Sequence, residues 1–589
     1  MSLLWVGCKP ETQGGIDDHA QDSIPVMGDW VRIYHANDPD RLHPYNARNA
    51  YATFIKEHIY MYLYDYDAQT MEHVPTLAKG APEISADQLS YTYEIRPEAT
   101  WDNGSPITAK DFEFSIKAVK LPLTDDAHQR NYYSFIKDIK LDPTNDRKFT
   151  VICSELFFLA ETAISGMEVI SREFYDPEHL LDNISVEAIS TKPDDVSKDP
   201  AAIKFADAFN ADINNSDPAH IYGSGPYKLE SWTPGDNVTL VRKDNWWGDK
   251  LRGKSWYFQG YVKKLIFKTI TDRATVPAAA QNDELDVIRD MSPDDFKAAR
   301  EDTAGYLYKN FNFHTPDSYS MMYLGFNCKP PAGRAPVLEE VAVRKALSHC
   351  ADLDGIIANI YNGYGQRQNG PITPLHPEEY DSKLKPLEFS VDMANKILDE
   401  AGWKDNDGDG IREKVIRGRK VKLEIEVLIS NSTDTGPRMV RMIADQALKA
   451  GIKLNTNALA FNIIQQKLRE HDFDIAALGF SASPLATDLK QVWHTENWLN
   501  GGSNYFGFGN ARTDSLIEKI RVTMDPAART PLYHEFQRLW QEEVPVIVLM
   551  APKEKILIHK RFRHASPTII RPGFKPLEFW VPLAEQRFK

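Results

Sequence analysis

Two short stretches of the sequence carry residues whose types and spacing suggest chemistry, and the first is Gly248–Ser255, GDKLRGKS. It matches the phosphate-loop pattern of a glycine, four residues, then Gly-Lys-Ser. A phosphate loop also needs a buried strand before it, small residues inside it and a helix that starts at the lysine. Here Trp246 and Trp247 precede the stretch, Lys250 and Arg252 are bulky, and the segment that follows lacks helical periodicity. We therefore expect no ATP or GTP site.

The second stretch is DNDGDGIRE, which copies the start of an EF-hand calcium loop with Asp405, Asp407, Asp409 and Gly410. Position twelve of such a loop needs a glutamate that binds calcium through both oxygens, and here it is Ile416. The pattern after it indicates a strand, whereas an EF-hand continues into a second helix. We expect a tight turn held by side-chain hydrogen bonds, with weak calcium occupancy as the alternative.

The rest of the sequence offers no recognisable catalytic constellation. It contains no HExxH, no G-x-S-x-G elbow, no dinucleotide fingerprint and no cysteine–histidine cluster. Acidic pairs such as Glu542 and Glu543 fit a solvated helix face, because a chain with 84 carboxylates offers many such pairs. We expect no enzymatic activity, no cofactor and no metal site, and a two-carboxylate glycosidase is the enzyme that we weigh against this expectation.

Composition argues against a nucleic-acid-binding protein and against a protein that crosses the membrane. The chain has 589 residues, of which 42% are hydrophobic, enough for two large lobes. Lys plus Arg number 69 and Asp plus Glu 84, and the resulting net charge of -15 disfavours nucleic acid as a partner. The longest apolar run, Val544–Ala551, contains Pro545 and is far shorter than the roughly 20 residues that cross a bilayer.

The N-terminus, LLWVGCKPETQGG, resembles the lipobox and polar tether of a bacterial lipoprotein, with Cys8 as the acylated residue. Trp5 stands where leucine is usual, and the residues before Cys8 are too few for a complete signal peptide. We expect a truncated signal with lipidation at Cys8, against the alternative of an ordinary terminal cysteine. Of the other cysteines, Cys328 and Cys350 could form a bridge with each other, which spacing alone does not assign.

Helix and strand patterns alternate in the second half of the chain. Residues 421–429 alternate between apolar and polar at period two, which predicts a strand. A helix beginning near Pro437 and closing at Gly451 follows, and residues 452–454 restart a strand, which makes a strand–helix–strand unit typical of α/β folds. A second helix is expected over Ser390–Ala401, with the serine as its N-cap.

Six stretches, in the same order along the chain, resemble the extracellular solute-binding proteins of family 5, the large receptors of peptide and nickel ABC transporters. They are DPDRLHP (38–44), WDNGSPITAKDFEFS (101–115), GSGPYKLESWTPGDNVTLVRKDNWWG (223–248), MMYLGFN (321–327), VRKALSHCADLDGII (343–357) and GGSNYFGFGNARTDSLI (501–517). The phosphate-loop look-alike directly follows the third of these stretches, and DGDGIRE also occurs in its usual place in the family, after a helix, so the resemblance makes both motifs ordinary scaffold.

The resemblance implies an α/β, two-lobed periplasmic binding protein fold of type II, with an extra subdomain in the first lobe. We place a signal and tether at 1–24, the first lobe at 25–322, the second lobe at 323–545 and a return to the first lobe at 546–589. Such a receptor closes around its ligand, and the permease reads the closed shape. The implied function is that of a substrate-binding receptor of an ABC importer, monomeric, in the periplasm or cell envelope, which delivers an oligopeptide or modified peptide to the permease.

The resemblance also suggests where the ligand lies. Peptide receptors of this family carry an aspartate after the FD strand that pairs with the peptide amine; here Ser483 takes that place, Ala477 replaces an arginine, and Asp488 could substitute if the loop folds differently. The loop SASP followed by GGSNY is similar to a YejA-like branch that takes modified or longer peptides. We expect the ligand-binding residues to be Tyr51, Arg367, Phe480, Ser481, Ser483, Trp493, Trp498, Asn504 and Tyr505.

Several of these residues also have a structural interpretation. Trp493 and Trp498 fit a packed core, and Asn504 fits the cap of a turn. Other functions also remain open on this fold, namely a chaperone, the input domain of a sensor, or a receptor for a nickel chelate or an oligosaccharide.

Overall fold

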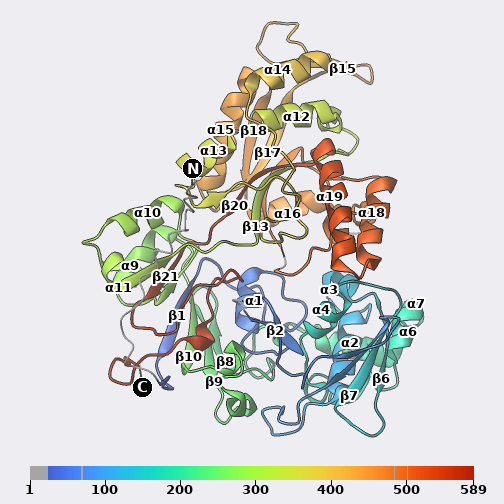
Figure 1. The fold of residues 1–589 in the computed structure, drawn as a ribbon, viewed down its shortest axis with the longest axis vertical. Helices are drawn as coiled ribbons and strands as arrows, with labels where there is room; N and C mark the ends of the chain where they lie inside the picture. Colours follow the sequence, from blue (N-terminus) through green and yellow to red (C-terminus); the bar gives the residue numbers. More distant parts are fainter. Residues whose placement is uncertain (1–23, 68–69, 126, 483, 500–501, 589) are drawn as a thin grey trace, which may run out of the picture.

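The computed structural model describes residues 24–67, 70–125, 127–482, 484–499 and 502–588. They form two lobes, each built around its own mixed β-sheet, with a smaller sheet attached to the first lobe (Figure 1). None of the described helices is long and apolar enough to cross a membrane. The architecture is the two-lobed α/β fold expected from the sequence.

A seven-stranded sheet forms the first lobe, and both ends of the described chain contribute to it. Strand β1 lies near its centre and pairs in parallel with β10 and β11, while β21, from the C-terminal part of the chain, is inserted between β11 and β12. In spatial order the strands are β12 (Phe311–His314), β21 (Ile556–His559), β11 (Val287–Ile288), β1 (Trp30–His35), β10 (Lys264–Thr269), β9 (Asn237–Arg242) and β8 (Tyr227–Thr233).

In the described part of the chain, the first lobe also contains four short helices outside the extra subdomain. They are α1 (Ala50–Lys56), α9 (Val276–Gln281), α10 (Pro293–Glu301) and α11 (Tyr306–Asn310), with the 3-10 turn η4 (Arg273–Thr275) before α9. Ser292 caps α10 by accepting a hydrogen bond from the Asp295 N–H, and Pro293 occupies its first turn, where proline is favoured.

The extra subdomain of the first lobe is a four-stranded antiparallel sheet with helices on it, at the lower right of Figure 1. Its strands are β4 (Glu83–Ile84), β5 (Ser90–Glu94), β7 (Lys148–Cys153) and β6 (Ile136–Leu141). Its helices are α2 (Ala109–Lys120), α3 (Ala127–Tyr132), α4 (Ala160–Ser165), α5 (Arg172–Tyr175), α6 (Val186–Thr191), α7 (Pro193–Val196) and α8 (Pro200–Phe209). A hairpin of β2 (Tyr64–Tyr66) and β3 (His73–Pro75) precedes it.

A six-stranded sheet forms the second lobe. In spatial order its strands are β14 (Gly365–Gln366), β20 (Val546–Pro552), β13 (Ser320–Phe326), β19 (Ile475–Ser481), β17 (Glu424–Ser430) and β18 (Lys453–Leu459), and β15 (Glu413–Ile416) with β16 (Arg419–Lys422) forms a separate hairpin. The helices are α12 (Val341–His349), α13 (Leu353–Asn359), α14 (Val391–Glu400), α15 (Thr435–Lys449), α16 (Phe461–Arg469), α17 (Lys490–Trp493), α18 (Ala511–Val522) and α19 (Pro526–Glu543).

The predicted strand–helix–strand unit is present as β17, α15 and β18, whose strands pair in parallel over their whole length. Gly451 closes α15 with a φ of +77°, as its position after the helix indicated. The side chain of Ser390 accepts a hydrogen bond from the Met393 N–H and so caps α14. The start of the first strand differs from the prediction of a strand over residues 421–429. Val421 belongs to the β15–β16 hairpin, and the core strand begins at Glu424.

The chain crosses between the two sheets at residues 315–319 and 553–555. The boundaries expected from the sequence, after residues 322 and 545, therefore need correction. Strand β13 lies entirely in the second-lobe sheet from Ser320, and β20, which we expected to return to the first lobe, pairs with β13 and β14 in the second. The run VPVIVLMAP is apolar at almost every position, so it carries no alternation that would tell one sheet from the other.

Candidate functional site in the cleft between the lobes

A cavity of about 1240 Å³ lies between the two sheets and is lined by residues of both lobes. The first lobe contributes the start of α1 and the segments that follow β10 and β11, at residues 48–51, 271–274 and 289–295. The second lobe contributes strands β13 and β19 and the loop 430–436 between β17 and α15. The volume exceeds the roughly 300–1,000 Å³ of common small-molecule pockets, so the cleft can hold a long or bulky ligand.

Charged side chains dominate the floor of the cleft at the first lobe and the crossing strands. Arg289 is 1% exposed, and its Nη2 lies 3.4 Å from Oε2 of Glu554 and 3.5 Å from Oδ1 of Asp290. Its guanidinium carbon lies 4.8 Å from the centre of the Phe54 ring. Two carboxylates and an aromatic ring hold this buried arginine in place. If its guanidinium moved away from the carboxylates, unpaired charges would be left in the protein interior.

Asp290 is surrounded by cations. Burial by itself would raise the pKa of its carboxyl, but Arg289, Arg571, Arg273 and Lys555 together lower the pKa below its ordinary value. Asp290 also has a φ of 60°, a left-handed conformation that is uncommon outside glycine. Its carboxylate is thus ionised and already engaged with protein cations.

Tyr51 projects from the second position of α1, whose N-cap Asn49 accepts a hydrogen bond from the Ala52 N–H. Its ring centre lies 4.9 Å from that of His35, and Asn37 is a hydrogen-bonding partner of its hydroxyl. Burial raises the pKa of the Tyr51 phenol, so it stays a neutral hydrogen-bond donor at physiological pH. Of the expected ligand residues that the structure describes, Tyr51 is the one that lines the cavity.

The second-lobe wall is mostly neutral. The loop SNSTDTG at 430–436 supplies hydroxyl and amide groups, and Tyr323, Phe461 and residues 477–479 add aromatic and small apolar surface. A cleft with one charged wall and one neutral polar wall suits a ligand whose polar backbone faces the second lobe.

The lobes touch each other on both sides of the cleft. On one side, Oδ2 of Asp294 in α10 lies 2.6 Å from Nη1 of Arg438 in α15, and its Oδ1 accepts a hydrogen bond from Asn362 at 2.7 Å. On the other side, the Phe158 N–H donates to the Arg521 carbonyl at 2.9 Å. With contacts on both sides, the lobes are in a closed arrangement.

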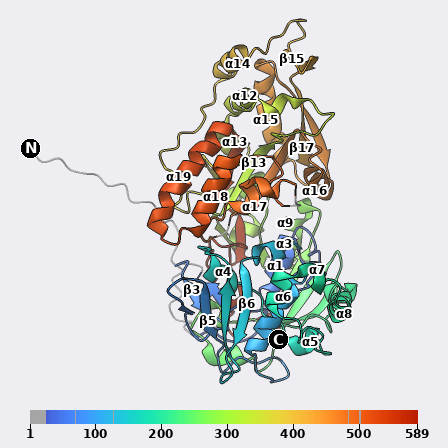
Figure 2. The ribbon, with the colours of Figure 1, turned by 90° about the vertical axis from the view of Figure 1, so that its right-hand side faces the viewer.

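The second of these contacts belongs to the extra subdomain. The Arg529 guanidinium stacks 4.3 Å from the Phe158 ring centre, and the Arg521 guanidinium 4.6 Å from that of Phe157. Figures 1 and 2 show helices α18 and α19 of the second lobe directly above α4 of the subdomain. The subdomain therefore takes part in the interlobe contact.

The other expected ligand residues that the structure describes lie outside the cavity lining. Phe480 and Ser481 continue β19 immediately beyond the lining residues 477–479, and Phe480 is 37% exposed. Arg367 follows β14 and lies 3.6 Å from Asp354, with which it can pair. Ser483 lies outside the described residues, as does Cys8.

Two of the expected ligand residues are structural, and these expectations need correction. Trp493 is 5% exposed and packs against Phe508 and Trp540 in the second-lobe core, with ring centres 5.6 and 5.8 Å away. Asn504 is fully buried, and its amide donates to the carbonyls of His494 and Phe508 at 3.1 and 2.9 Å. Both side chains thus pack inside the second lobe, in the part formed by residues 493–499 and 502–508.

Trp498 and Tyr505 also pack against this region. The Trp498 ring lies 5.4 Å from that of His471, and the Lys329 ammonium lies 5.1 Å from its centre. His471 bonds the carbonyl oxygens of both Trp498 and Tyr505, at 2.9 and 3.2 Å. Asp488, the alternative partner for a ligand amine, lies 3.5 Å from Nε of Arg521.

The phosphate-loop look-alike forms 3-10 turns, η2 (Trp247–Leu251) and η3 (Trp256–Phe258), and no described helix begins at Lys254. The side chain of Trp246 occupies the space beside Gly248, where a Cβ atom would meet its ring at 2.3 Å. The segment is thus a packed connection between β9 and β10.

The calcium-loop look-alike is a turn held by side-chain hydrogen bonds, as expected. The Asp405 carboxylate accepts hydrogen bonds from the N–H groups of Gly408 and Gly410 at 2.7 and 2.9 Å. The Asp407 carboxylate pairs with Lys420 and Lys422, each at 3.0 Å. Protein ammonium groups therefore already neutralise the carboxylates that a cation would use.

Among the described residues, two groups bring three metal-type ligand atoms within 4.8 Å of one another, namely Asp405/Asp407/Glu413 and His494/Glu496/Glu518. The second group holds an ammonium too, because Nζ of Lys490 lies 2.8 Å from Oε1 of Glu518. The described cysteines Cys153, Cys328 and Cys350 are free thiols, so the structure does not form the bridge that spacing left open.

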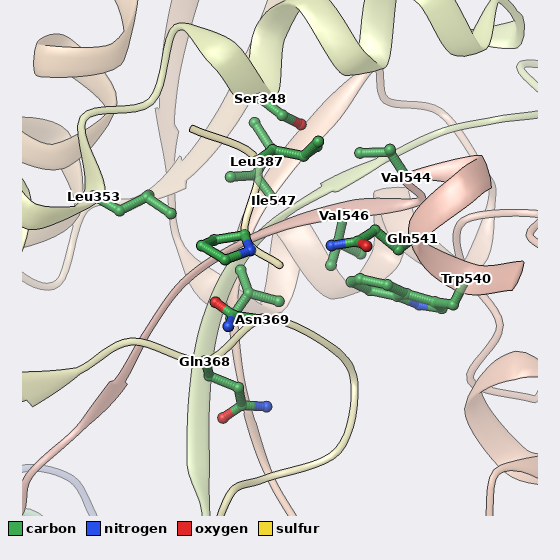
Figure 3. A pocket seen from close by; sticks show the side chains of 12 residues that line it. Ser348, Leu353, Gln368, Asn369, Leu387, Trp540, Gln541, Val544, Val546 and Ile547 are labelled. Atoms are coloured by element: carbon green, nitrogen blue, oxygen red, sulfur yellow. The ribbon is translucent and has the colours of Figure 1, made fainter. Parts of the chain in front are cut away.

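A second, smaller pocket of about 50 Å³ lies within the second lobe (Figure 3). Leu387, Trp540 and Ile547 give it a largely apolar lining, to which Gln541 and Asn369 add amide groups. Its volume suits one or a few water molecules rather than a ligand of the size that the interlobe cleft can take.

Sequence reasoning missed the charged floor of the cleft, namely Arg273, Arg289, Asp290, Lys555 and Arg571. Arg273 begins η4, Arg289 and Asp290 follow β11, Lys555 follows β20, and Arg571 follows β21, so only the fold brings them together. No local motif marks them. The one available signal is their position at the ends of strands next to the crossings, where binding sites gather in α/β folds.

The chain was compared with known proteins. Residues 72–499 match the defining pattern of the bacterial extracellular solute-binding proteins, family 5, middle region. The oligopeptide-binding protein AppA of Bacillus subtilis is 22% identical over 537 residues, which cover 90% of this chain and 87% of that protein. The dipeptide-binding protein of Escherichia coli is 21% identical over 555 residues, covering 90% and 88%.

Solved structures share the fold. That of AppA from Bacillus subtilis in complex with a nonapeptide superposes with a TM-score of 0.75 at 19% identity, covering 95% of this chain and all (100%) of that one. That of NikA from Brucella suis in complex with Fe(III)-EDTA gives 0.73 at 19% identity, covering 94% and 100%. With its two lobes, its crossing strands and the match over residues 72–499, the chain belongs to the bacterial extracellular solute-binding proteins, family 5.

Proposed function

We propose that this protein is the substrate-binding receptor of an ABC importer and that it captures an oligopeptide or modified peptide between its lobes. The observation that carries the proposal is the cavity of about 1240 Å³ lined by both lobes. A ligand that touches both walls binds only the closed form, so binding shifts the population toward closure and gives the permease a shape to recognise.

The lining favours a peptide over a bare metal ion. No histidine or cysteine is among the described residues that line the cleft, and the second-lobe wall offers hydroxyl and amide groups that can bond a peptide backbone. Solved relatives are complexes with peptides in some cases and with metal chelates in others, so a chelate is the second ligand class that the test must include.

We propose further that the protein acts as a monomer outside the cytoplasm, without enzymatic activity, and that Cys8 anchors it by a lipid. These features agree with the lipobox-like N-terminus and with the name of the family.

The test exposes the purified protein to a defined pool of tetra- to nonapeptides, and separately to nickel–histidine, and identifies what is retained by native mass spectrometry. Retention of peptides with a compaction of the protein in X-ray scattering is the expected result. Retention of nickel–histidine with no peptide would replace the proposed ligand, and peptides returned shortened would indicate an enzyme. A permease deletion that leaves peptide uptake by cells unchanged would point to a sensor or chaperone.

A further inference from the structure

We propose that the ligand carries a carboxylate, which binds in the cleft at the ammonium of Lys555 within the cationic cluster of Arg273, Arg289, Lys555 and Arg571. This inference rests on the proposed function, because it names the chemistry of the ligand that the same cleft captures. The cationic cluster is the set of these four residues, all of which line the cavity.

The charges of the cluster do not balance within the protein. Its four cations are accompanied by two carboxylates, Asp290 and Glu554, which leaves an excess of two positive charges. Glu554 is shared, since its two oxygens lie 3.4 Å from Arg289 and 3.5 Å from Arg571. Nη1 of Arg273 donates to the backbone carbonyl of Asp290 at 3.3 Å.

Lys555 is the member of the cluster that lacks such a partner. Among the described carboxylates none forms an ion pair with its Nζ, which lies 5.8 Å from the centre of the Tyr361 ring. Burial lowers the pKa of Lys555, and Glu554 and Asp290 only partly oppose this effect. An anion arriving in the cleft would therefore relieve a desolvated ammonium.

The other acidic side chains of the lining are engaged elsewhere. Asp272 accepts a hydrogen bond from the N–H of Ala274 in η4, and Asp294 is bound by Arg438 across the cleft. Asp295 accepts from the Ser292 hydroxyl at 2.7 Å, and Asp434 lies 3.8 Å from Arg438. None of these four carboxylates forms a described ion pair with the cationic cluster, so the Lys555 ammonium remains available to the ligand.

A ligand ammonium would be repelled at this place. To pair with Asp290 it would have to compete with Arg289, which lies 3.5 Å from that carboxylate, and with the charges of the other cations nearby. A carboxylate instead gains charge-assisted hydrogen bonds from a lysine and arginines in a partly desolvated site. It can come from the C-terminus of a peptide or from an aspartate or glutamate side chain.

The experiment separates these two sources with one competition. The purified protein is offered an equimolar pool of pentapeptides, each present with a C-terminal carboxylate and as the C-terminal amide, and each with a central Glu or Gln. Retained peptides are counted by mass spectrometry. We expect peptides with the carboxylate that Lys555 binds to be enriched about tenfold to a hundredfold over their uncharged counterparts. This is the range that a charge-assisted hydrogen bond contributes.

Matched variants assign the preference to its residue. Lys555→Met should reduce the enrichment to less than about threefold while peptides are still retained, and Lys555→Arg should restore most of it. Lys553→Met is the control, because Lys553 lies on the same crossing segment but pairs with Asp317 at 2.9 Å and does not line the cavity; it should keep the full enrichment. Thermal melting checks that each variant is folded.

Equal retention by the wild type in both comparisons, C-terminal acid against amide and Glu against Gln, would overturn the inference and leave peptide capture standing. An enrichment that survives Lys555→Met would also overturn it, because another group would then bind the carboxylate. If no peptide of either form is retained, the proposed peptide ligand itself is wrong, and this inference falls with it.

Discussion

Asp294 of the first lobe and Arg438 of the second form an ion pair across the cleft, with 2.6 Å between Oδ2 and Nη1. The Asn362 amide donates to the other oxygen of the same carboxylate at 2.7 Å. The partners lie on separate lobes, so this contact exists only when the lobes are closed. Its energy therefore adds to the affinity for any ligand that closes them.

The first prediction removes the second-lobe partner of this pair. Arg438→Gln should weaken peptide binding by about two- to fivefold, mostly through faster dissociation, because exposed ion pairs contribute up to about 1 kcal/mol. Stopped-flow tryptophan fluorescence measures the rates. Arg441→Gln, an exposed arginine of the same helix, is the control. The loss should shrink at 1 M salt; equal rates for the two variants would show that the pair plays no part in closure.

The second prediction concerns the extra subdomain. Phe158→Ala removes the ring on which Arg529 stacks at 4.3 Å, a contact of roughly 0.5–2 kcal/mol. We expect faster amide hydrogen exchange in α18 and α19 of the liganded protein and a Kd raised by about two- to tenfold. Leu141→Ala, at a half-exposed position of the same subdomain, should change neither. Unchanged exchange in the Phe158 variant would mean that the subdomain does not support closure.

The third prediction is a pH dependence of stability. His35 is 1% exposed, and burial lowers its pKa to about 3, whereas the unfolded chain titrates near 6.5. The unfolded state thus binds the proton first, so stability contributed by neutral His35 is present above pH 6.5 and is lost as the pH falls toward 3. His35→Phe should lack this loss.

Urea unfolding of the wild type and of the His35→Phe variant at pH 7 and pH 4 measures this loss of stability. Relative to the wild type, the His35→Phe variant should gain about 3 kcal/mol in free energy of unfolding on going to pH 4. A difference between the two proteins that is the same at both pH values would show that His35 titrates normally in the folded state.

The fourth prediction is that calcium does not stabilise the fold. Lys420 and Lys422 pair with Asp407, and Ile416 stands where a calcium-binding glutamate would be. Adding EDTA or millimolar calcium should move the melting temperature by less than about 1 °C, because an ion stabilises the folded protein only if it binds to it. An increase of several degrees with calcium, absent in an Asp405→Asn variant, would contradict this.

The fifth prediction is that the free amine of a bound peptide matters little. The Asp290 carboxylate on the cleft floor is already held by surrounding cations, and Asp488 lies next to Arg521. N-terminal acetylation should therefore change Kd by less than about tenfold, below the range of a strong charge-assisted hydrogen bond. Isothermal titration of matched peptides measures it, and a hundredfold loss would mean that a carboxylate does reach the amine.

The fold was predictable where a local pattern carries a physical meaning. The amphipathic run from Pro437 to Gly451 and the alternation before it specify β17, α15 and β18, because periodicity and capping act over neighbouring residues. The sheet to which Val546–Pro552 belongs was not predictable, since pairing is decided by β13, more than two hundred residues away.

The candidate site was predictable only in part for the same reason. Tyr51 was expected because it follows the stretch that resembles the family's first ligand-contacting loop, and it does line the cavity. Its contact with a ligand stays a prediction. Trp493 and Asn504 were misassigned because sequence places them near the cleft but does not give the direction of their side chains. The cationic cluster and Asp290 gain their chemistry from segments far apart in the chain, such as Arg289 and Lys555.

Strand β21 sits between β11 and β12 in the middle of the first-lobe sheet, although it lies close to the C-terminal end of the chain. A chain that is still being synthesised has β1 and β11 but nothing to join β12 to them until Ile556–His559 appear. The second-lobe sheet spans one continuous stretch, Ser320–Pro552, and is complete earlier. The first half of the polypeptide is therefore the last part to finish folding, and loss of the final few dozen residues would disable the lobe that was made first.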